Sequence, residues 1–106
     1  GTLDTQGHKL AVNGTIRAKE ILVESNWADF VFKKGYKLPT LREVEEYIKK
    51  KGTLPDVPSE EEIKANGVNL GATNALLLQK IEELTLYVIQ QQKEIEELKS
   101  KITQAK

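Results

Sequence analysis

Apolar residues in the last third of the chain follow a heptad pattern. From Leu77 onward the steps between them alternate between four and three residues, which is the spacing of a and d positions in a coiled coil. We call these positions the heptad seam. Its members are Leu77, Ile81, Leu84, Val88, Gln91, Ile95, Leu98 and Ile102. Because so narrow a stripe requires identical helices from other copies to cover it, we expect residues 72–106 to form a long helix in a coiled coil. The chain then acts as an assembly module.

Residues at and beside the seam bear on orientation and stoichiometry. Glu94 falls at g and Lys99 at the following e, the spacing of an interchain ion pair in a parallel bundle. Gln91 occupies a d position, where a polar residue usually sets register at a cost in stability. A ring of Gln91 amides that binds an anion or water is the alternative. β-branched residues at a with Leu at d favour a coiled coil of two helices. The Gln91 layer and the apolar flanks within 86–89 favour a coiled coil of more than two helices. Side chains alone leave dimer and trimer open.

Residues 8–24 show alternating apolar positions, which predict short β-strands. Asn13-Gly14 lies between two of them and is a strong turn signal. The strands would form either a tight hairpin or a sharp corner whose strands pair with other chains. Because a lone two-stranded hairpin is marginal in water, a helix or a neighbouring subunit has to cover it. Residues 1–24 are therefore predicted to be β-rich, and the fold class to be α+β.

Residues 25–71 are expected to form a small globular region with two short helices. Thr40 with Glu43, and Ser59 with Glu62, have the spacing of capping boxes that begin these helices. A proline-rich connector at 54–58 separates them. The predicted globular core consists of Trp27, Phe30, Phe32, Tyr36, Leu41, Val44 and Ile48. An aromatic platform for a ligand is the alternative interpretation of the aromatic members.

The composition of these 106 residues argues against binding of nucleic acid, metal or cofactor and against insertion into a membrane. Sixteen Lys and Arg balance sixteen Asp and Glu, so we expect no nucleic-acid partner. The chain lacks cysteine, and its only histidine, His8, has no neighbour with which to share a metal, so we expect no metal and no cofactor. No apolar run is long enough for membrane insertion. The chain does not begin with Met, so we expect it to be a piece of a longer protein.

Several stretches together resemble the C-terminal domain of Bacteroidetes surface and tail-fibre-like proteins. They are LPTLREVEEYI at 38–48, LPDVPS at 54–59, NGVNLG at 66–71 and LLLQKIEELTLY at 76–87, while LAVNGTIRAKEI at 10–21 resembles the end of a fibre shaft. The resemblance covers about residues 8–100. That domain is similar to the intramolecular chaperone domain of phage tailspikes and endosialidases.

The resemblance implies a homotrimer, with a dimer as the second possibility, on a cell surface or a virion fibre outside the cell. Its implied task is to bring three chains into register so that an upstream β-rich shaft of the same chain can fold. In endosialidase-type domains a Ser-Asp dipeptide supports self-cleavage. This chain has Ser25-Asn26 there, without the basic residues that usually follow. We therefore expect a non-catalytic cap that stays attached.

Two other functions remain as alternatives to the assembly cap. The first is a receptor- or glycan-binding tip of a fibre or adhesin, which predicts an exposed aromatic cluster, whereas the core interpretation predicts a shielded Trp27. The second is a self-cleaving chaperone domain centred on Ser25. No Ser–His pair or carboxylate pair supports this second alternative, because His8 is the only histidine.

Overall fold

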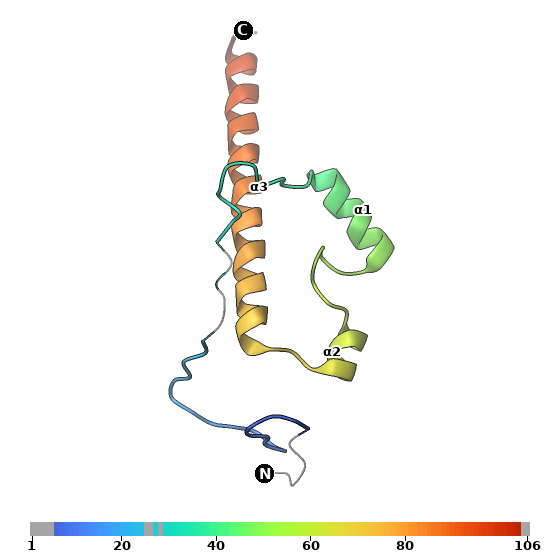
Figure 1. The fold of residues 1–106 in the computed structure, drawn as a ribbon. Helices are drawn as coiled ribbons and strands as arrows, with labels where there is room; N and C mark the ends of the chain where they lie inside the picture. Colours follow the sequence, from blue (N-terminus) through green and yellow to red (C-terminus); the bar gives the residue numbers. More distant parts are fainter. Residues whose placement is uncertain (1–5, 25–26, 28, 105–106) are drawn as a thin grey trace.

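A computed structural model describes residues 6–24, 27 and 29–104. Within these residues the chain forms three helices and no strand: α1 (Leu41–Lys51), α2 (Glu60–Asn66) and α3 (Leu70–Gln104) (Figure 1). The Cα radius of gyration is 20.4 Å, well above the roughly 13 Å of a compact domain of this length. The long α3 accounts for this shape, and the other elements lie along one half of it.

The predicted α+β fold is wrong, because the N-terminal segment is irregular over its described residues. Neither Asn13 nor Gly14 has a positive φ, so the dipeptide does not form the tight hairpin turn that it favours. Leu10, Ile16 and Leu22 are exposed. Within the described residues no second segment offers its backbone for pairing, and a two-stranded hairpin without a covering layer is too weak to form.

Both short helices begin where their capping boxes predict. Thr40 Oγ1 accepts a hydrogen bond from the Glu43 backbone N–H at 3.1 Å, and the Glu43 carboxylate accepts one from the Thr40 N–H at 3.1 Å. Ser59 and Glu62 make the same reciprocal pair at 3.2 Å. Gly52 ends α1 with φ of 76°, a left-handed conformation that glycine adopts without steric cost. The two predicted capping boxes are confirmed.

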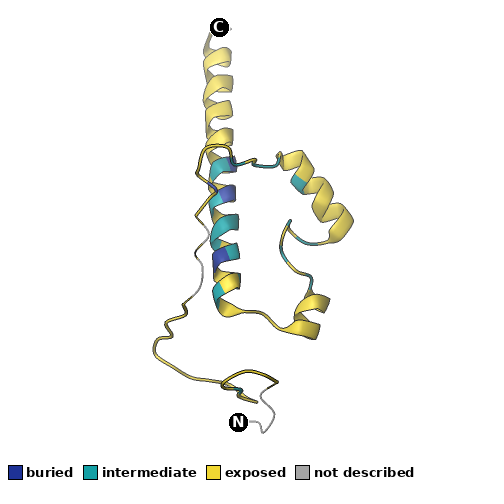
Figure 2. Cartoon of the chain, viewed as in Figure 1, coloured by how far each residue is buried: buried dark blue, intermediate teal, exposed yellow. Residues whose placement is uncertain are grey.

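The long final helix is also confirmed, and it begins at Leu70. Its 35 residues correspond to a length of about 52 Å. Figure 2 shows that burial is confined to its first half, where Ala75, Glu83 and Tyr87 are buried. From residue 88 to residue 104 every position is exposed. The second half of α3 therefore projects from the rest of the chain.

An irregular segment, residues 30–39, contains two turns and bonds to α3 through Tyr36 and Pro39. Val31, within this segment, is only 3% exposed. Neither α1 nor α2 packs a face against α3, and neither contains a buried residue. Most of the burial in the described part of the chain therefore comes from the 30–39 segment lying on α3.

Candidate functional site

The heptad seam is exposed along the whole of α3. Its seven apolar members are each 47–61% exposed, and Gln91 is exposed as well. The seven are Leu77, Ile81, Leu84, Val88, Ile95, Leu98 and Ile102. They run from Leu77 to Ile102, a distance of about 38 Å along the helix axis. An exposed apolar stripe of this length, interrupted by the polar Gln91, is typical of an interaction surface.

The buried face of α3 points away from the seam. Counted in the same heptads, Ala75 falls at b, Glu83 at c and Tyr87 at g. None of these is an a or d position, and the bonds of Glu83 and Tyr87 to the 30–39 segment place that segment beside the seam and not on it. The covering segment therefore leaves the seam accessible to another helix.

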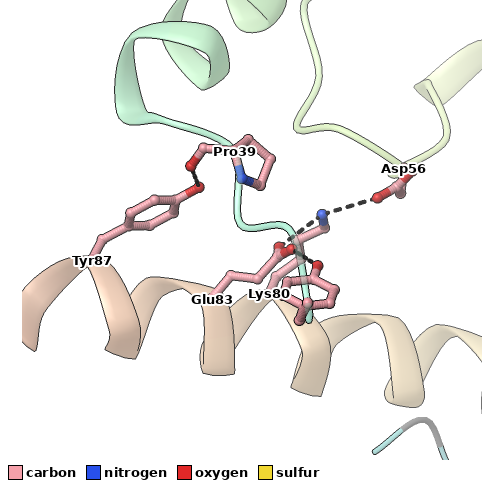
Figure 3. Close-up of polar contacts among 6 residues, drawn as sticks. Pro39, Asp56, Lys80, Glu83 and Tyr87 are labelled. Carbon is pink, nitrogen blue, oxygen red and sulfur yellow. Dashed lines mark hydrogen bonds and ion pairs between the residues drawn. The ribbon is translucent and has the colours of Figure 1, made fainter. Parts of the chain in front are cut away.

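A small set of polar contacts, which we call the polar latch, joins the preceding segments to α3 (Figure 3). The Tyr87 hydroxyl donates a hydrogen bond to the Pro39 carbonyl oxygen at 2.6 Å, and the Tyr36 hydroxyl donates one to the Glu83 carboxylate. Lys80 Nζ lies 3.0 Å from Glu83 Oε1 and 3.4 Å from Asp56 Oδ2. The 36–39 segment and the connector before α2 are thereby tied to the same two turns of the helix.

The latch tyrosines are held in their protonated form. Burial raises the pKa of Tyr36 to about 12, and the hydrogen bond to Glu83 and its negative charge act in the same direction. Burial also raises the pKa of Tyr87, with the charges of Glu83 and Glu43 adding to the effect. Both hydroxyls are therefore hydrogen-bond donors at neutral pH, which suits structural contacts and provides no base or nucleophile.

The aromatic residues of the predicted globular core are distributed unevenly. Trp27 is 66% exposed and Phe32 is exposed, whereas Tyr36 is half-buried and its ring lies 5.6 Å from that of Phe30. On α1, Leu41 and Ile48 are exposed and Val44 is half-buried. These α1 residues are not brought together with the aromatic ones in a buried cluster.

Sequence reasoning missed the residues that make the contact with α3. Val31 stands between Phe30 and Phe32, and the larger aromatic side chains are the stronger candidates for a core by size. Lys80 and Glu83 have the ordinary spacing of an exposed ion pair on a helix. Nothing in the sequence indicates that Tyr36 reaches Glu83, 47 residues further along the chain.

A groove of about 520 Å³ separates the α1 side of the chain from α3. Its α3 wall includes three seam residues, Leu77, Ile81 and Leu84. Its opposite wall includes Val44 of α1 and Leu54 of the connector. The groove is therefore mainly apolar and opens onto the heptad seam.

The other predicted site residues take no part in these contacts. Glu94 and Lys99 are exposed, and among the described residues neither forms an ion pair within the chain. Ser25 and Asn26 lie outside the described residues. His8 is exposed, and the described part of the chain has no cluster of His, Cys, Asp or Glu suited to a metal ion. Among the helices described, none has the length and apolar character needed to cross a membrane.

No protein-family description, no curated protein and no solved structure matches the chain.

Proposed function

We propose that this chain is a non-catalytic assembly module in which α3 pairs with α3 of identical copies to form a parallel homotrimer. The observation that carries the proposal is the division of α3 into two faces. Glu83 at c and Tyr87 at g are buried and bond to the chain's own 30–39 segment, while the a and d positions stay in water over about 38 Å. A heptad seam is complementary to a copy of itself, because its knobs and holes repeat with the same period.

A parallel arrangement follows from charge. Glu94 at g and Lys99 at the next e are exposed and have no ion-pair partner among the described residues of their own chain, so each is available to the partner helix. Such an exposed pair contributes only about 0.2–1 kcal/mol, so it selects orientation more than it stabilises. Three strands are proposed on the basis of the resemblance to fibre domains and of the Gln91 layer, with two strands as the alternative.

We further propose that the trimer caps a fibre outside the cell and helps an upstream shaft to fold. The support is the resemblance of residues 8–100, together with the exposed apolar side chains of the N-terminal segment. Leu10, Ile16 and Leu22 lie in water in the single chain, so neighbouring copies or the shaft would have to cover them. An intertwined shaft has many contacts between distant residues and folds slowly. A preformed trimer would hold the three shaft segments close together and so raise their local concentration.

Absolute mass by light scattering over a dilution series tests this proposal. One chain has a mass of 11.9 kDa, so a stable particle of about three times that mass is expected. Replacing Leu84 with Asp places a charge in the seam and should yield dissociated chains. A wild-type monomer at all concentrations, or an unchanged trimer of the Leu84→Asp variant, would refute assembly through the seam. A dimer would keep the coiled coil and refute the stoichiometry.

A second candidate function has its own observation. Trp27 is 66% exposed and Phe32 is exposed, as expected for aromatic residues that stack on a glycan or contact a receptor. Acrylamide quenching of the single tryptophan in the assembled protein distinguishes the two interpretations. A strongly quenched Trp27 whose fluorescence changes on titration with oligosaccharides would favour a binding tip. A shielded Trp27 would show that neighbouring copies bury it and would remove this candidate.

A further inference from the structure

We infer that the α1 side of each chain clasps the α3 helix of the neighbouring copy, so that the groove between α1 and α3 is completed only in the assembly. This inference rests on the proposed self-association. It adds that the partner helix is held by two surfaces of the first chain: the heptad seam and a wall made of α1 and the following connector. We call this wall the α1 clasp and define it by Val44, Leu54 and Pro55, which all line the groove.

Among the described residues, neither of the other two helices packs a face against α1. Its apolar residues Leu41, Val44 and Ile48 lie on one face, yet none is buried and two are exposed. An isolated helix shorter than about 12–15 residues is marginal in water, and α1 has 11 residues. Its caps contribute only about 1 kcal/mol each. The apolar face of α1 therefore needs a covering surface to keep the helix stable.

The lining of the groove identifies that surface. Three of the α3 residues that line it, Leu77, Ile81 and Leu84, are seam positions, which a second α3 would contact in any coiled coil. Val44 and Leu54 line the same groove as these seam residues, so a helix that lies on the seam at this level also lies beside Val44 and Leu54. A second copy of α3 would therefore contact both walls of the groove, the heptad seam and the α1 clasp.

The e side of the partner helix meets the clasp. The groove also includes Lys80 and Tyr87, which are g positions, so it opens on the g side of α3. In a parallel coiled coil the g side of one helix faces the e side of the next. The e position at this height is Leu78, an apolar residue that lies outside the seam. Leu78 is half-buried in the single chain, and contact with the clasp of a neighbouring chain would cover the part that remains in water.

The height of the contact follows from the polar latch. Asp56, two residues after Leu54, lies 3.4 Å from Lys80, so the connector is anchored at the level of that residue. Leu78 precedes Lys80 by two residues, or about 3 Å along the helix axis. With three helices in register, Leu54 of one chain therefore lies beside Leu78 of the next. Leu78 of the same chain is on the e side, across the seam from the clasp.

Cysteine cross-linking tests this arrangement, because the chain has no cysteine of its own. The variant combines Leu54→Cys with Leu78→Cys in the full chain and is treated with a short bismaleimide. We expect covalent dimers and trimers on a denaturing gel. The matched control combines Leu54→Cys with Gln92→Cys, an e position about 21 Å further along α3, and should remain monomeric on the gel. Cross-links confined to single chains, or none at all, would overturn the inference.

A second variant keeps the test independent of cross-linking chemistry. Leu54→Asp puts a charge in the clasp at a residue that is 44% exposed in the single chain, and should weaken trimer association by about tenfold or more. Ile63→Asp on α2 is the control, since Ile63 is similarly exposed and does not line the groove. Equal effects of the two substitutions would refute the clasp. A trimeric mass without Leu54–Leu78 cross-links refutes the clasp alone, whereas a monomeric wild-type mass refutes the proposed function as well.

Discussion

Replacing Ile95 with alanine removes an apolar side chain from an a position in the projecting half of α3, where only partner helices can bury it. Ile95 is 47% exposed in the single chain, and complete burial of an isoleucine stabilises by about 1.5–3 kcal/mol. The half that is still in water therefore corresponds to roughly 1 kcal/mol per chain, or about 3 kcal/mol for a trimer. The cavity left by the missing atoms adds to this loss. Trimer association should weaken by about 100-fold.

The matched control is Ile89→Ala, at a b position on the same helix. Ile89 is 44% exposed, so the two substitutions remove the same atoms from equally exposed sites and change helix propensity by the same amount. Sedimentation equilibrium over a dilution series measures the association constant, and circular dichroism at 222 nm measures the melting temperature. We expect Ile95→Ala to shift both and Ile89→Ala to shift neither by more than a small amount. Indistinguishable association constants for the two variants would refute the heptad register.

Three further perturbations test other parts of the molecule. Tyr87→Phe removes the hydrogen bond to the Pro39 carbonyl and should lower the free energy of unfolding in urea by about 1 kcal/mol. The control is Tyr47→Phe, for which the structure gives no hydroxyl hydrogen bond, and it should change this free energy little. Equal losses in the two variants would argue against the latch. The folded-state pKa of Tyr36, about 12, lies above the ordinary value of 10.0, so the folded chain holds this proton more tightly. Its contribution to stability is therefore complete below pH 10 and is lost as the pH rises toward 12, with a slope of at most about 1.4 kcal/mol per pH unit. Urea titrations between pH 8 and 11 should show this decline, and Tyr36→Phe should flatten it; a decline of the same size in that variant would exclude Tyr36 as its source. Gln91→Leu should raise the melting temperature while broadening the mass distribution in light scattering, because it removes the polar layer that sets register; an unchanged melting temperature would place Gln91 outside the seam.

Local signals predicted the helices well, because each depends on residues that are close in sequence. The Thr40–Glu43 and Ser59–Glu62 boxes mark helix starts through hydrogen bonds across three residues, and both are present in the structure. The alternation at residues 8–24 is an equally local pattern, yet it predicted strands wrongly. A strand requires a hydrogen-bonding partner from elsewhere, and its residues cannot supply that partner from their own pattern.

The period of the apolar residues in the last third was enough to establish a long helix with one apolar seam, because a helix satisfies its backbone hydrogen bonds internally and needs only its own residues to form. Which face of that helix the chain itself covers depended on tertiary structure. The burial of Val31, the reach of Tyr36 to Glu83 and the contact of Tyr87 with Pro39 join residues that are more than 40 positions apart or lie in an irregular segment. No spacing rule relates such residues, since their proximity arises from the path of the whole chain. That path also creates the groove between α1 and the seam, and no periodicity in the sequence predicts this groove.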